Sequence, residues 1–329
     1  MGRQSISTGS AQADDPVPDE GPDVEVEQRT CDVPLDLHGW RVDRALTQLV
    51  PEFSRSYLQQ LLADGAVTLR GQPCRKASQR VAVGDALAVL LRPTPQAQAF
   101  VAQPMALDVV FEDAHLLVIH KPAGLVVHPA AGHWSGTLLN GLLAHHAGAA
   151  ALPRAGIVQR LDKDTSGLML VGKSRAAVDA LVRAIGAREV NRQYLALAHK
   201  AWGPRKHREV DAPIGRHKTQ RVRMAVAPNG KPAITHYEPM EHLGQITVLR
   251  CRLETGRTHQ IRVHLQSIGH PIVGDPVYGG SRKTPVFPRQ ALHAEILEFT
   301  HPISGEWLEF EAPLPADMAA LVEALRAAP

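Results

Sequence analysis

Residues 156 to 174 place a group of charged side chains between two apolar segments. Ile157 and Val158 come before the group and Leu168 to Val171 come after it, and segments of this length are typical of buried strands. Most charged loops between strands are solvated bends in which opposite charges neutralise one another, but such a group can also lie at the mouth of a cleft. Spacing alone leaves both interpretations open. The charged residues are Arg160, Asp162, Lys163 and Asp164.

The length and composition predict a two-domain globular protein without a membrane anchor. The 329 residues exceed the roughly 150 residues of an average domain. No apolar run approaches the roughly 20 residues that span a bilayer, and the polar N-terminus lacks the apolar core of a signal peptide. We therefore expect a cytoplasmic protein. Three cysteines stand far apart with no CxxC pair, which argues against a zinc site or a disulfide framework.

Charge is distributed unevenly along the chain. Residues 1 to 30 carry seven acidic residues and two arginines, a net charge of −5. Because the whole chain has a net charge of +3, the remainder has a net charge of +8. Residues 1 to 32 contain few large apolar residues, and we expect a disordered acidic tail. The basic remainder suits a polyanionic partner.

The sequence pattern of residues 33 to 93 predicts a small α+β module. Val42, Leu46 and Leu49 recur at helical spacing, and Ser54 can cap a second helix that ends near Gly65. Short strands follow, at residues 66 to 69 and 81 to 91. A polar, proline-containing linker at residues 94 to 104 then separates the module from a second domain, residues 105 to 329.

Two residues of the second domain stand out on local grounds. Tyr194 lies in a predicted strand, where it shares a face with the small Ala196 and Ala198, which leave room beside the ring. A buried core tyrosine is nevertheless the default interpretation of such a position. Arg262 lies at the edge of the apolar stripe of a helix that Thr258 can cap, and a cation there needs a partner. His259 and His264 lie five residues apart with no third ligand nearby in the sequence. We therefore expect structural roles for both histidines and no metal.

Residues 205 to 223 are the most basic stretch of the chain. A phosphate backbone is a suitable partner for such a stretch, and a solvated loop is the alternative. Its predicted RNA contacts are Arg216, Lys218 and Arg221.

Four segments resemble motifs of the pseudouridine synthases that modify ribosomal and transfer RNA. They are RLDKDTSGL at 160–168, KPAGLVVHP at 121–129, RQY at 192–194 and GRTHQIRVHL at 256–265. The resemblance implies that Asp162 is catalytic, that Arg262 pairs with it and that Tyr194 lies against the target base. It also implies that Arg160 fills the space left by a flipped base. The family usually has histidine before this arginine, whereas this chain has Gln159, which cannot become cationic.

The N-terminal module resembles the S4 RNA-binding module through RVDRAL at 41–46 and FSRS at 53–56. That resemblance implies RNA contacts at Arg44, Arg55, Arg75 and Lys76. For the second domain, the family resemblance implies an α+β fold with a mixed, largely antiparallel sheet in two halves around a central cleft.

The resemblance covers about residues 35 to 325 and is strongest to the enzymes of large-subunit (23S) ribosomal RNA. It implies isomerisation of specific uridines to pseudouridine without a cofactor, by a monomer whose partner is ribosomal RNA in a large-subunit particle. Alternatives are another ribosomal site or a transfer RNA, a non-catalytic RNA-binding ribosome-assembly protein, and a hydrolase that releases the base.

Overall fold

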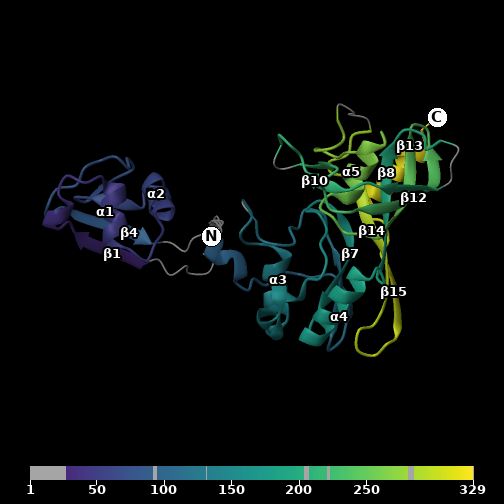
Figure 1. Ribbon diagram of the computed structural model, residues 1–329, viewed down its shortest axis with the longest axis horizontal. Coiled ribbons are helices and arrows are strands. Elements are labelled where there is room, and N and C mark those ends of the chain that lie inside the picture. Colours follow the sequence, from purple (N-terminus) through teal and green to yellow (C-terminus); the bar gives the residue numbers. More distant parts are fainter. Residues whose placement is uncertain are drawn as a thin grey trace, which may run out of the picture. The chain divides into compact units, whose positions relative to one another are not determined.

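The computed structural model describes residues 27–91, 95–130, 132–203, 207–220, 223–280 and 285–328 (Figure 1). The chain divides into two compact units, at the junction between Gln96 and Ala97. Each unit has its own buried core. Within the described ranges, no helix is both long and apolar enough to cross a membrane.

The first unit packs two helices against a four-stranded antiparallel sheet of order β1-β4-β2-β3. Both predicted helices are confirmed, and the Ser54 hydroxyl accepts a hydrogen bond from the Tyr57 amide as the expected cap. The predicted strand at 81–91 is shorter than expected and begins at Ala86. The elements are β1 (Glu27–Asp32), η1 (Leu35–Leu37), α1 (Val42–Leu49), α2 (Arg55–Ala63), β2 (Val67–Leu69), β3 (Gln72–Pro73) and β4 (Ala86–Leu91).

The predicted disordered tail ends earlier than residue 32. Residues 27 to 32 form β1, which pairs in antiparallel register with the whole of β4, from Glu27 opposite Leu91 to Asp32 opposite Ala86. An edge strand draws its stability from backbone hydrogen bonds to its neighbour, so the low apolar content of this segment did not reveal it. The rest of the predicted tail lies outside the described residues.

Asp43 holds the two helices of the first unit together. Its side chain is fully buried, and its carboxylate accepts hydrogen bonds from Arg41 Nε at 3.0 Å, Arg55 Nη2 at 2.9 Å and Gln59 Nε2 at 3.0 Å. The Arg41 guanidinium, followed by Arg55 and Gln59, holds the pKa of Asp43 well below its usual range. The contribution of Asp43 to stability is therefore present above the unfolded pKa of about 4 and is lost as the pH falls.

We expect Asp43→Asn to loosen this unit by about 1.5 to 3 kcal/mol, the range for hydrogen bonds to a charged group. In the full chain, amide hydrogen exchange in peptides covering α1 and α2 should then accelerate roughly 10- to 100-fold. Asp64→Asn is the matched control, because it removes a carboxylate that is exposed at the end of α2. Equal exchange in the two variants would contradict a stabilising role for Asp43.

The second unit is built on a nine-stranded sheet of order β5-β6-β7-β14-β8-β13-β12-β9, with β15 paired to β14. Strands β7 and β14 run parallel and the other described pairs are antiparallel, so the expected mixed sheet and α+β character are confirmed. The strands are β5 (Val109–Glu112), β6 (Leu116–Lys121), β7 (Ser166–Gly172), β8 (Asn191–His199), β9 (Arg208–Asp211), β12 (Ile234–Leu243), β13 (Ile246–Leu253), β14 (Leu292–Thr300) and β15 (Trp307–Glu311).

Helices and a small second sheet complete this unit. Ser174 caps α4 by accepting a hydrogen bond from the Ala177 amide, as predicted. The 3-10 helix η2 (Pro95–Phe100) contains the junction between the two units. The remaining elements of the second unit are α3 (Leu138–His145), η3 (Ala147–Ala151), η4 (Pro153–Gly156), α4 (Arg175–Gly186), α5 (Gln260–Ser267), α6 (Ala316–Arg326) and the pair β10 (Ile214–Arg216) and β11 (Met224–Val226).

Both faces of the large sheet are covered. Leu168 and Leu170 of β7 pack on one face with Leu181 of α4, whereas Met169 and Val171 pack on the other face, in the cluster to which α3, α5 and α6 contribute. Because side chains alternate along a strand, a strand buried on both faces reads as a continuous apolar run. The four-residue run at 168–171 is therefore the strand that the sequence predicted.

The apolar pair before the charged group is not a strand. Ile157 makes a single isolated bridge to Val171, because the preceding residues turn too tightly to extend. Arg154 and Ala155 both have left-handed φ values of 54°, and Gly156 follows at 84°. A Cβ at Gly156 would lie 1.9 Å from the Gly172 carbonyl oxygen of β7, so this close approach requires glycine.

Candidate active site

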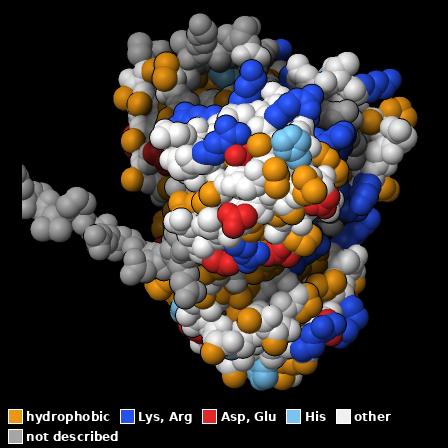
Figure 2. Space-filling view, turned by 90° about the vertical axis from the view of Figure 1, so that its left-hand side faces the viewer, with side chains coloured by type: hydrophobic (Ala, Val, Ile, Leu, Met, Phe, Trp, Pro, Cys, Tyr) orange, Lys and Arg blue, Asp and Glu red, His pale blue; other side chains and the backbone are white. Residues whose placement is uncertain are grey.

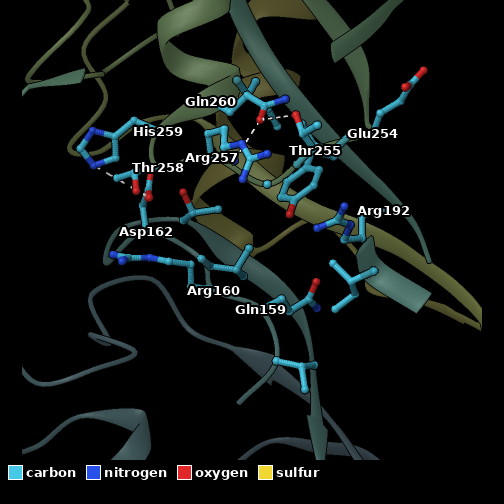
Figure 3. A pocket seen from close by; sticks show the side chains of 18 of the residues that line it. Gln159, Arg160, Asp162, Arg192, Glu254, Thr255, Arg257, Thr258, His259 and Gln260 are labelled. Atoms are coloured by element: carbon cyan, nitrogen blue, oxygen red, sulfur yellow. Dashed lines mark hydrogen bonds and ion pairs between the residues drawn. The ribbon is translucent and has the colours of Figure 1, made fainter. Parts of the chain in front are cut away.

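A pocket of about 680 Å³ opens in the second unit, and the charged group 160–162 forms one of its walls (Figure 3). The other walls come from β8, from the end of β13 and from the segment that enters α5. Figure 3 shows Asp162 and His259 on one side of the pocket and Arg192 on the other. Of the charged loop, Arg160 and Asp162 therefore face a pocket.

Two buried basic side chains hold the loop that carries Asp162. Lys121 is fully buried, and its Nζ donates to the carbonyl oxygens of Lys163, Pro122 and Leu125 at 2.9, 2.7 and 3.0 Å. Arg289 Nη1 donates to the Asp164 carbonyl oxygen at 3.0 Å. Lys163 and Asp164 are the two central residues of a turn that the hydrogen bond from the Thr165 amide to the Asp162 carbonyl closes. The position of Asp162 is therefore set by the core beneath this turn.

Arg262 joins two carboxylates that are far apart in the sequence. Its Nη1 donates to Asp162 Oδ2 at 2.9 Å, while its Nε and Nη2 donate to the two oxygens of Asp275 at 2.7 and 3.0 Å. Arg262 is 4% exposed. The expected contact between Arg262 and Asp162 is thus present, and the bidentate pair with Asp275 fixes the plane of the guanidinium that meets Asp162.

Asp275 is the buried carboxylate that holds Arg262 in place. Its side chain is fully buried, and its Oδ1 also accepts the amide hydrogens of Val277 and Tyr278, each at 2.9 Å. Burial acts to raise the pKa of Asp275, but the bonds from Arg262 and from the two amides outweigh burial and hold this pKa below its usual value. A permanently charged Asp275 keeps Arg262 paired when the second carboxylate is engaged elsewhere.

Helix α5 begins at a different residue from the one predicted, and it has a different N-cap. The helix begins at Gln260, and its N-cap is His259, with a left-handed φ of 57°, instead of Thr258. This turn aims the His259 ring into the pocket, where Nε2 lies 3.9 Å from Asp162 Oδ1 and Nδ1 lies 2.9 Å from the Tyr278 hydroxyl. Burial lowers the pKa of His259. His264, in contrast, is fully buried against Thr235 and the Ala212 carbonyl, which is a structural position.

Tyr194 lies on β8 and lines the same pocket. It is 7% exposed, and the small Ala196 and Ala198 are fully buried. Burial raises the pKa of the phenol, which keeps it protonated at neutral pH. The pocket thus brings together the three residues expected to be catalytic, Asp162, Tyr194 and Arg262.

The predicted RNA contacts fall into three places. Arg160 is exposed at the pocket, next to Gln159 and Asp162 (Figure 3). Arg216 and Lys218 are exposed around the end of β10, and Arg221 lies outside the described residues. The contacts expected in the first unit, Arg44, Arg55, Arg75 and Lys76, are all exposed.

Sequence reasoning missed several residues of the site. Lys121 stands in the segment 121–129 that resembles a family motif, but nothing local showed that its side chain would bond to the Asp162 loop or that Asp275 would hold Arg262. His259 was expected to be structural, and the left-handed turn that directs it into the pocket has no clear signal in a non-glycine residue. Among the described residues, no three His, Cys, Asp or Glu side chains converge to hold a metal ion.

The fold and the site define a known class of protein. Residues 115–267 match the model of the RNA pseudouridylate synthase family. The chain also resembles the solved structure of human RNA pseudouridylate synthase domain containing 1, with a TM-score of 0.51 and 28% identity, over 69% of this chain and 98% of that one. A second human structure, RNA pseudouridylate synthase domain containing 4, shares the fold with a TM-score of 0.53 at 22% identity, over 66% of this chain and 92% of that one.

The chain is also similar to proteins that it matches over most of their length. The chain is 51% identical to ribosomal large subunit pseudouridine synthase D of Nitrosomonas europaea, over 90% of this chain and 88% of the relative. It is 46% identical to the protein of that name from Escherichia coli strain K12, over 91% and 95% of the two chains. This protein therefore belongs to the RNA pseudouridylate synthase family.

Proposed function

We propose that this enzyme isomerises specific uridines to pseudouridine in large-subunit (23S) ribosomal RNA. The observation that carries the proposal is the ion pair of the buried Arg262 with the partly exposed Asp162 at the pocket wall, 2.9 Å between Nη1 and Oδ2. The chain's relatives at 46 to 51% identity are named ribosomal large subunit pseudouridine synthase D. We further propose that the enzyme acts as a cytoplasmic monomer on a large-subunit particle.

In this proposal Asp162 acts on the sugar and Arg262 aims it. The reaction breaks the bond from C1′ to N1, turns the uracil and rejoins C1′ to C5. A carboxylate can attack C1′ or stabilise the positive charge that develops there, and the adjacent guanidinium favours the ionised form. Tyr194 would lie against the base. The uridine must leave its stack at a cost of a few kcal/mol, and Arg160 would fill the vacated space.

We also propose that the first unit is an S4-like RNA-binding module and that the pocket is part of a cleft for the flipped nucleotide. Exposed Arg44, Arg55, Arg75 and Lys76 would contact RNA phosphates, together with Arg216, Lys218 and Arg221 of the second unit. Figure 2 shows Lys and Arg side chains spread over the viewed face, interspersed with a smaller number of acidic ones. Such a surface attracts a polyanion with salt-dependent affinity.

The test maps pseudouridines across total ribosomal and transfer RNA from cells that lack the endogenous large-subunit enzyme. We expect the wild-type chain to restore pseudouridines in large-subunit RNA. Restoration in transfer RNA alone would overturn the substrate assignment. Free uracil released from RNA would indicate a hydrolase. Binding without any modification would indicate a ribosome-assembly protein.

The proposed RNA-binding role of the first unit leads to a separate prediction about RNA affinity. We expect the double variant Arg75→Gln/Lys76→Gln to weaken RNA binding and to reduce the slope of log K against log salt by about 0.7 to 0.9 for each lost phosphate contact. The matched control is Arg175→Gln/Arg326→Gln, which also removes two positive charges, from side chains engaged in exposed ion pairs of the second unit. Filter-binding titrations at several salt concentrations provide the slopes. The same slope in both variants would contradict the assignment.

A further inference from the structure

Arg192 is a buried cation in the pocket that has an unused hydrogen-bonding edge. It lies on β8 two residues before Tyr194, so both side chains leave the strand on the same face. Arg192 is 5% exposed and lines the pocket. Its Nε and Nη2 are buried and make no hydrogen bond within the described part of the chain. Buried donors without a partner are rare because each one costs free energy.

The same edge of the guanidinium is filled at several other arginines of this chain, of which Arg70, Arg289 and Arg262 are examples. Nε and Nη2 lie side by side and match the two oxygens of a carboxylate. Arg70 uses this edge to bind Asp85 at 2.6 and 2.8 Å, and Arg289 uses it to bind Asp317 at 2.7 and 2.9 Å. Arg262 binds Asp275 in the same way. Arg192 has the same geometry without the carboxylate.

The carboxylates that line the pocket are engaged by other cations. Glu254 pairs with Arg188 and lies 2.6 Å from His236 Nε2, and Asp162 pairs with Arg262 on the opposite side of the pocket (Figure 3). Gly256 also leaves room for the guanidinium, because a Cβ there would lie 3.1 Å from Arg192 Nη1. The pocket therefore contains a cation whose positive charge is not neutralised by a bonded partner.

We propose that Arg192 is a further catalytic residue, which stabilises the uracil anion that forms when the glycosidic bond breaks. This inference rests on the proposed isomerisation. As the bond from C1′ to N1 breaks, its electron pair leaves with the base, and the resulting charge spreads over N1, O2 and O4. The free edge of Arg192 donates to a carbonyl oxygen of this anion. C5 then supplies the electron pair for its new bond to C1′, which frees Asp162 from C1′ and makes the base neutral again. The C5 proton is lost to solvent and N1 takes up a proton, an exchange that leaves the charge unchanged.

The position of Arg192 favours the base over a phosphate as its partner. Tyr194, two residues along the same face, is the side chain proposed to lie against the uracil, so the Arg192 guanidinium is close to that ring. A phosphate remains on the solvated RNA backbone, whereas Arg192 is almost fully buried. A preorganised donor in a buried site stabilises charge that develops during the reaction more than it stabilises the neutral ground state.

The test uses single-turnover kinetics with a hairpin from the target RNA that carries tritium at C5 of uridine, whose release reports the isomerisation. Across a range of RNA concentrations, Arg192→Met should lower the maximal rate at least 100-fold, the effect of losing one donor to a developing anion, while the RNA dissociation constant stays within threefold. The maximal rate of Arg192→Lys should lie between those of wild type and Arg192→Met, because lysine keeps the positive charge but lacks the paired donors of arginine. Arg175→Gln is the control for losing one positive charge outside the pocket.

Stability provides a second readout that a structural role would not produce. Replacing a buried, unpartnered cation with an apolar side chain of similar length removes a desolvation cost, so Arg192→Met should unfold at a higher temperature than wild type. A lower unfolding temperature would overturn the inference. A raised RNA dissociation constant with an unchanged maximal rate would also overturn it and indicate a phosphate contact. If the wild-type enzyme forms no pseudouridine, the proposed function and this inference are overturned together. If the wild-type enzyme is active and Arg192→Met reaches the same maximal rate, the inference alone is overturned.

Discussion

Asp162→Asn is expected to abolish pseudouridine formation while leaving the fold and RNA binding intact. The amide keeps the size of the side chain but cannot supply the negative charge that attacks or stabilises C1′. We expect the single-turnover rate to fall about 1,000-fold or more, equivalent to about 4 kcal/mol of transition-state stabilisation. The fold should survive, because Arg262 stays paired with the buried Asp275 through two hydrogen bonds.

Asp164→Asn is the matched control for this prediction. Asp164 lies in the same loop, but it contacts the core through its backbone carbonyl, which accepts a hydrogen bond from Arg289. Its substitution therefore leaves the loop anchored, and we expect a rate within tenfold of wild type. Tritium release measures both rates, and a binding titration confirms that each variant still holds the RNA. An Asp162→Asn rate within tenfold of wild type would contradict the assignment of Asp162.

Arg262→Met is expected to destabilise the second unit as well as to stop the reaction. It leaves the fully buried Asp275 carboxylate without its cation, and breaking a buried ion pair in this way costs about 3 to 5 kcal/mol. It also removes the group that aims Asp162. Urea denaturation should show a lower unfolding midpoint, and no pseudouridine should form.

A second substitution separates these two effects. In the double variant Arg262→Met/Asp275→Asn the buried charge is gone, and an amide oxygen at position 275 can still accept the amide hydrogens of Val277 and Tyr278 that Asp275 Oδ1 accepts. We expect stability to recover by more than half of the loss, while activity stays absent because Asp162 remains unpaired. Recovery of activity along with stability would show that Arg262 acts only through the fold.

The sequence predicted a large part of the framework. The caps at Ser54 and Ser174, the helices that follow them and the strand around Leu168–Val171 were all predicted from local patterns. These features depend on residues close together in the chain, where capping geometry and side-chain periodicity decide the outcome. The pairing of Arg262 with Asp162, 100 residues apart, was expected only because the motifs resembled a known family.

Local patterns failed where the backbone takes a less common path or where an edge strand pairs through its backbone. Left-handed Arg154 and Ala155 prevented a strand at Ile157, and left-handed His259 displaced the predicted cap at Thr258. Residues 27 to 32 became a strand by pairing with β4. In each case the deciding interactions come from other segments of the chain, which composition and spacing do not describe.

The sequence by itself determined which residues can do the chemistry: a carboxylate at Asp162, an aromatic ring at Tyr194 and guanidinium groups at Arg262 and Arg160. Only the tertiary structure decided their environments. Folding buried Asp275 beneath Arg262, placed Lys121 under the Asp162 loop and left one edge of Arg192 without a carboxylate. The physical reason is that the strength of a charge inside a protein depends on burial and on its partners, and both are set by contacts between residues far apart in the chain.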